Sequence, residues 1–128
     1  MKNLLSIFIF CISFFAQSQE KKLDSIYNYE DVTLKPSFSG GIEKFYKFIG
    51  KHYQIPEKLN TKVKVLTEFV IEKDGSISNI TILEDPGYGT GEEAIKALKK
   101  SPKWNPGEKD GVSVRTKYKL PITLHNAD

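Results

Sequence analysis

Two stretches of the chain alternate between apolar and polar residues with the two-residue period of a β-strand. Between Val63 and Glu72, one face carries Val63, Val65, Thr67, Phe69 and Ile71. Between Val112 and Leu124, one face carries Val112, Val114, Thr116, Tyr118, Leu120, Ile122 and Leu124. The opposite face of this second stretch carries Ser113, Arg115, Lys117, Lys119 and Thr123. The pattern predicts two half-buried strands.

A third strand is predicted directly after the first of these two. Residues 73–76, Lys-Asp-Gly-Ser, are turn formers, and apolar alternation resumes at Ile77, Ile80 and Ile82. Two alternating runs joined by such a turn predict a β-hairpin. Residues 85–87, Asp-Pro-Gly, end the hairpin because proline and glycine interrupt a strand.

Two helices are predicted from apolar residues three or four positions apart. The first begins at Gly40-Gly41 and runs to about His52, with an inward face of Ile42, Phe45, Ile49 and Tyr53. The second runs from about Gly91 to Lys100, with an inward face of Ala94, Ala97, Leu98 and Ser101. Thr90 and Glu93 have the spacing of a capping box, in which each side chain binds a free amide at the helix start.

Residues 26–34 contain enough apolar and aromatic side chains to predict a further short strand, which Pro36 ends. The predicted order is therefore strand, helix, strand, strand, helix, strand. We expect an α+β fold in which two helices cover one face of a small antiparallel sheet of about three main strands.

The N-terminus has the pattern of an export signal. Lys2 precedes an apolar run from Leu4 to Phe15, and small residues stand at Ala16 and Ser18. The run is shorter than the roughly 20 residues that cross a bilayer core. We expect cleavage after residue 18 and a periplasmic protein; the alternative is an uncleaved N-terminus anchored in the inner membrane. The predicted division is a signal peptide (1–18), a leader with a possible short strand (19–35) and one domain (36–128).

Composition and chemistry exclude several classes of function. The 19 Lys and Arg against 16 Asp and Glu give a net charge of +3, which falls to +2 without Lys2, so nucleic-acid binding is not expected. Cys11, the one cysteine, lies in the predicted signal peptide, and His52 and His125 are the two histidines. No nucleophile-base pair or metal-ligand spacing is visible. We expect no catalytic residue, no metal, no cofactor and no enzyme activity. Trp104 is expected in the core; the alternative is an exposed aromatic side chain that anchors a partner.

Several short motifs occur in a specific order along the chain. They are F-S-G-G (38–41), I-P (55–56), K-D-G (73–75), E-A (93–94), P-K-W-N-P-G (102–107) and L-P-I (120–122). Together they resemble the C-terminal domain of TonB, over roughly Val32 to Thr123. The resemblance implies a non-enzymatic binding module that grips an outer-membrane TonB-dependent transporter or another envelope protein. Typical members are energy transducers with a membrane helix and a proline-rich spacer; this chain resembles a stand-alone exported version without direct energy coupling.

The expected binding site is an edge strand. Pro121 lacks an amide hydrogen, so its strand belongs at a sheet edge. Because successive residues of a strand face opposite edges, the open edge is expected to present Ser113, Arg115, Lys117 and Lys119. The positive charges of Arg115, Lys117 and Lys119 either discourage aggregation or bind an acidic peptide. We expect an extended segment of the partner to be added as a strand; the alternative is a structural envelope protein that forms a homodimer through the same edge.

Overall fold

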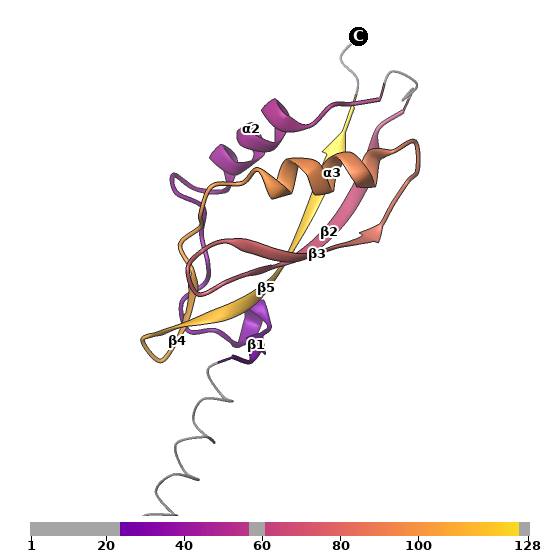
Figure 1. Ribbon diagram of the computed structural model, residues 1–128. Coiled ribbons are helices and arrows are strands. Elements are labelled where there is room, and N and C mark those ends of the chain that lie inside the picture. The colour runs from indigo at the N-terminus through magenta and orange to yellow at the C-terminus, as the bar shows by residue number, and fades with distance from the viewer. Residues whose placement is uncertain (1–23, 57–60, 126–128) are drawn as a thin grey trace, which may run out of the picture.

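The computed structural model describes residues 24–56 and 61–125 (Figure 1). The predicted signal peptide lies outside these residues. The strands are β1 (Ile26–Tyr27), β2 (Val63–Ile71), β3 (Ile77–Glu84), β4 (Gly107–Lys109) and β5 (Val112–Leu124). The helices are the 3₁₀ turn η1 (Tyr29–Asp31), α2 (Ile42–His52) and α3 (Thr90–Lys99).

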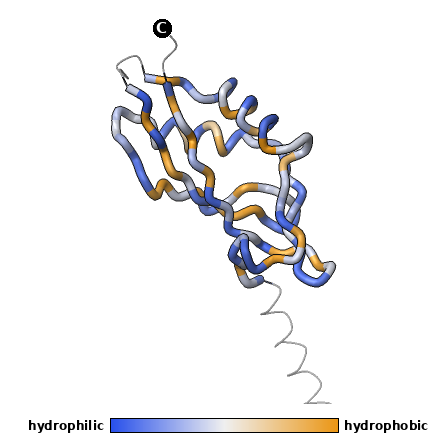
Figure 2. Tube along the Cα trace, turned by 180° about the vertical axis from the view of Figure 1, so that it is seen from behind, coloured by the Kyte–Doolittle hydropathy of each residue, from blue (hydrophilic) through white to orange (hydrophobic). Residues whose placement is uncertain are grey.

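The three main strands form the antiparallel sheet that the alternating pattern predicted. β2 lies in the middle, with β3 on one side and β5 on the other. The pairing of β2 with β5 is continuous, from Val63 opposite Leu124 to Ile71 opposite Thr116. Apolar and polar residues alternate along these strands (Figure 2), so one face of the sheet is apolar.

Both helices lie over that apolar face, as expected for an α+β fold of this kind. Phe45 and Ile49 of α2 are buried, and α3 contributes three more buried side chains, those of Ala94, Ala97 and Leu98. They pack against the sheet residues Val65, Phe69, Ile71, Leu120, Ile122 and Leu124. Trp104 is 3% exposed and belongs to the same core, which confirms its predicted place.

The N-terminal segment differs from the strand predicted over residues 26–34. Only Ile26 and Tyr27 form a strand, β1, and it pairs with β5 in parallel, so the sheet is mixed rather than wholly antiparallel. The chain then turns through η1 and crosses to β4, where the amides of Thr33 and Leu34 both donate to the carbonyl of Glu108. β4 itself, which pairs with the start of β5, was not predicted.

The start of α3 also differs from the prediction, because no capping box forms. The residue that precedes the helix is Gly89, in a left-handed conformation at φ +77°, and no side chain caps it. Thr90 is already the first helical residue and is fully buried; its hydroxyl donates to the carbonyl of Gly87 at 2.6 Å. The helix therefore begins one residue earlier than it would if Thr90 were the capping residue.

Candidate functional site

β5 has one edge that its own chain covers only in part. β2 pairs with β5 from Thr116 to Leu124 along one side. On the other side, β1 pairs with Arg115 and Thr116 and ends there. Among the described residues, no strand pairs with this second edge beyond Thr116. β5 therefore leaves an open edge over its C-terminal half.

Pro121 indicates which backbone groups face this open edge. It has no amide hydrogen, and its carbonyl oxygen accepts a hydrogen bond from the hydroxyl of Tyr46 in α2 at 3.3 Å. Residues two apart in a strand direct their N–H and C=O groups to the same edge. Lys117 and Lys119 therefore present their backbone donors and acceptors at the edge to which Pro121 belongs.

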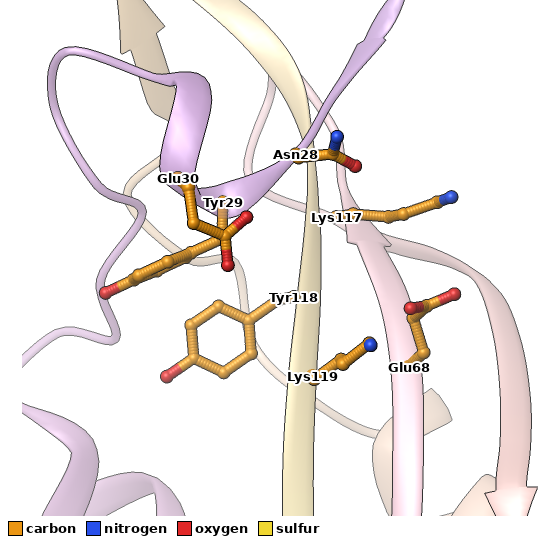
Figure 3. Close-up of a pocket in the computed structure, with 7 residues that line it drawn as sticks. All are labelled: Asn28, Tyr29, Glu30, Glu68, Lys117, Tyr118 and Lys119. Atoms are coloured by element: carbon orange, nitrogen blue, oxygen red, sulfur yellow. The ribbon is translucent and has the colours of Figure 1, made fainter.

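A groove of about 540 Å³ lies along this part of the edge (Figure 3). It begins where β1 ends and is lined by Asn28, Tyr29, Glu30, Glu68, Lys117, Tyr118 and Lys119. The rings of Tyr29 and Tyr118 meet edge to face, with their centroids 5.5 Å apart. Figure 3 shows Lys117 and Lys119 directed away from the two tyrosine rings, as alternation along β5 requires.

The tyrosine side of the groove is continuous with the core. Tyr118 stacks on Phe69 at 5.6 Å between ring centroids and also contacts Trp104 at 5.2 Å. Burial, with smaller contributions from the neighbouring Tyr29 and Tyr46, raises the pKa of the Tyr118 hydroxyl above its usual value. Tyr118 is therefore uncharged at neutral pH and presents an apolar ring with a polar tip.

Arg115 does not line the groove but holds the segment that leads into β1. Its guanidinium donates to both carboxylate oxygens of Glu72, at 2.7 and 3.2 Å, and to the backbone carbonyl of Asp24 at 3.2 Å. The hydrogen bond from Arg115 holds the pKa of the Glu72 carboxyl below its usual value. Arg115 thus links the β2–β3 turn to the segment that leads into β1.

The four residues predicted for the binding edge fall into two groups. Ser113 is paired with Glu108 of β4, and Arg115 with Ile26 of β1, so both lie on the covered part of β5. Lys117 and Lys119 lie on the open part and line the groove. No pattern in the sequence indicated that Tyr29 or Glu30 would join them, because their segment was expected to be a strand.

The opposite edge of the sheet, along β3, is less regular. Its pairing with β2 shifts register at two points, and Asn79 has a left-handed conformation at φ +49°. Such bulges twist an edge and interrupt its row of hydrogen-bonding groups. The edge of β5 opposite β2 is the better template for an added strand.

Two further kinds of feature are not found in the described part of the chain. Within residues 24–56 and 61–125, no three His, Cys, Asp or Glu side chains gather as metal ligands. No helix of that part is long and apolar enough to span a membrane.

Residues 54–124 match the family model of the Gram-negative bacterial TonB protein C-terminal domain. The match covers more than half of the chain, so the protein belongs to the TonB C-terminal family. This is an envelope-associated family of non-enzymatic protein-interaction domains that act in transport and interact with outer-membrane transporters.

Comparison with solved structures finds similarity to the TonB C-terminal domain of Helicobacter pylori, known from an NMR solution structure. The identity is 24%, the similarity covers 66% of this chain and 91% of that one, and the TM-score is 0.46. Comparison with curated proteins finds no match.

Proposed function

We propose that this protein is a periplasmic binding module that adds an extended segment of an outer-membrane transporter, or of another envelope protein, to the open edge of β5. The proposal includes export with removal of residues 1–18. The alternative is a protein held at the inner membrane by its uncleaved N-terminus. In either case the binding step is non-covalent and needs no cofactor.

The observation that carries this proposal is the open edge beyond Thr116. β1 is already a strand added to β5, and the groove continues in line from the point where β1 ends. An extended peptide placed there satisfies backbone groups of Lys117 and Lys119 that β2 does not reach. Strand addition of this kind takes much of its affinity from main-chain hydrogen bonds.

Self-association through the same edge is the competing function. In an antiparallel pair of two β5 edges centred on Tyr118, Lys117 of one copy lies opposite Lys119 of the other. Like charges directly opposite one another destabilise a strand pair. The basic edge therefore favours a partner of different sequence over a second copy.

Amide hydrogen exchange measured by NMR tests the proposal. The mature protein is used to capture envelope proteins, and synthetic peptides covering their periplasmic segments are then added to it. We expect a binding peptide to slow exchange at Lys117 and Lys119. Val114, Thr116 and Tyr118 serve as internal controls because their amides already face neighbouring strands.

Two results contradict the proposal. One is that saturating peptide leaves exchange at both lysines unchanged. The other is that peptide protects Ile80 and Ile82 on β3 instead. Dimerisation that rises with protein concentration, together with protection of Lys117 and Lys119 in the absence of peptide, supports self-association.

A further inference from the structure

We propose that the groove selects a short acidic–apolar–acidic segment, whose apolar side chain packs on Tyr29 and Tyr118 while the two acidic side chains lie against Lys117 and Lys119. This inference rests on the proposed strand addition and states which sequence the added strand must have. It follows from the length of the open edge and from the different chemistry of its two sides.

The open edge is short because it is closed at both ends. At its N-terminal end, β1 occupies the position beside Thr116, and Arg115 fastens the approach to β1 through Asp24. At its C-terminal end, Pro121 offers no donor and its carbonyl already accepts the hydroxyl of Tyr46. Between these two ends, Lys117 and Lys119 each retain both a donor and an acceptor for an added strand. So short a ladder supplies little selectivity, and side chains must supply the rest.

The side of the groove that faces the helices suits an apolar residue. Residues directly opposite in paired strands point to the same face. A ligand residue opposite Tyr118 therefore points toward the rings of Tyr118 and Tyr29, which are held edge to face at 5.5 Å. Tyr29 is 38% exposed, so a ligand side chain gains contact area by covering it.

The other side of the groove suits acidic residues. The ligand residues that flank the apolar one lie opposite Lys117 and Lys119, both exposed. Neither ammonium group forms an ion pair within the described part of the chain. Glu68 lies opposite Lys119 on β2, one strand further from the ligand. With strands about 4.8 Å apart, a ligand carboxylate lies about twice as far from the β2 position as from the lysine position, so attraction exceeds repulsion.

Glu30 fixes the register of the ligand. It lines the groove beside Tyr29, as Figure 3 shows. A slip of one residue turns every side chain of a strand to the other face. The slipped ligand brings its carboxylate to Glu30 and the tyrosine rings, and its apolar residue to the lysines. Only one of the two registers is therefore favourable.

Two peptides of identical composition test this inference. One is acetyl-Ser-Glu-Val-Glu-Val-Ser-amide, and the other is acetyl-Ser-Glu-Glu-Val-Val-Ser-amide, in which the alternation is broken. Each is titrated into the mature protein at low salt, and the amide chemical shifts of Lys117 and Lys119 are followed. We expect the alternating peptide to bind at least about tenfold more tightly, and both affinities to fall as salt is added.

A charge exchange provides the matched variant. In the double variant Lys117→Glu/Lys119→Glu, the alternating peptide should lose about tenfold in affinity, and acetyl-Ser-Lys-Val-Lys-Val-Ser-amide should gain by a similar factor. If repulsion from Glu68 prevents the double variant from folding, the variant Lys117→Gln/Lys119→Gln replaces it. We then expect the acidic and basic peptides to bind with equal affinity.

The outcomes separate this inference from the function on which it rests. Equal affinity for the two acidic peptides overturns the inference. It is also overturned if neither designed peptide binds while a captured envelope segment protects Lys117 and Lys119, in which case strand addition itself stands. If no captured segment protects these two residues, the proposed function is wrong as well.

Discussion

Trp104 contacts four aromatic rings although it lies in a short loop between two prolines. Its ring centroid is 4.7 Å from that of Phe45, 5.2 Å from Tyr118, 5.5 Å from Phe38 and 6.0 Å from Phe69. These rings come from α2, β5, the loop before α2 and β2. A single side chain thus ties both main layers of the molecule together, next to the groove.

Replacing this tryptophan should make the domain less stable. We expect Trp104→Ala to lower the free energy of unfolding by about 3 to 5 kcal/mol, since a large buried ring is lost. The control is Lys103→Ala, because the neighbouring lysine is exposed and forms only a surface ion pair with Asp74 at 3.8 Å. Urea melts measure both changes. A loss below about 1 kcal/mol for Trp104→Ala would show that the ring is not part of the core.

Gly75 in the β2–β3 turn is required for two separate reasons. Its φ of +89° is unfavourable for other residues, and an added Cβ would lie 1.9 Å from the carbonyl oxygen of Trp104. Gly111, in the β4–β5 turn, has a similar φ of +83° but open space around the Cβ position. We expect Gly111→Ala to lower the free energy of unfolding by about 1 kcal/mol and Gly75→Ala to lower it by at least twice as much. Equal losses in thermal melts of the two variants would contradict the steric clash.

The ion pair of Arg115 with Glu72 joins the β2–β3 turn to the segment that leads into β1. The Glu72 side chain is 24% exposed, and the hydrogen bond from Arg115 lowers the pKa of its carboxyl. The unfolded chain therefore takes up this proton at a higher pH than the folded protein. The stabilisation is complete above the ordinary pKa of 4.5 and is lost as pH falls through the lower folded value.

The variant Glu72→Gln tests this linkage. We expect it to be less stable than the wild type at pH 7, and the difference to shrink at about pH 3.5. Urea melts at both pH values measure it, and Glu84→Gln, at the exposed end of β3, is the matched control. A difference that stays constant with pH would mean that the ion pair contributes nothing to stability.

Alternation of apolar and polar residues predicted the long strands but not the short ones. It predicted β2, β3 and β5 because one face of each packs on a core, so the pattern is imposed along the whole strand. β1 and β4 have two and three residues, too few for a period to be visible. β4 pairs with β5 beyond the end of β2, and β1 pairs with the opposite edge of β5.

Export of the protein can be tested independently of its fold. We propose that the signal peptidase cleaves after Ser18, because Ala16 and Ser18 provide the small residues it recognises. Intact-mass measurement of the natively exported protein should find Gln19 at the N-terminus, free or cyclised. Recovery from the inner membrane of a chain that still begins at Met1 would favour a short-tethered protein instead.

Periodicity along the chain was enough to predict the α+β class, the three main strands and both helices, because burial on one face imposes a period that can be read directly. It also determined that Lys117 and Lys119 share a face and that Pro121 belongs at an edge. The folded structure was needed to show that β1 covers Arg115, that Ser113 pairs with β4, and that Tyr29 and Glu30 complete the groove. β4 is too short to show a period, and the contacts of β1, Tyr29 and Glu30 with β5 join residues about 90 positions apart, as in the register of Ile26 with Arg115. Such pairing depends on where the chain returns in space and leaves no periodic signal in either segment.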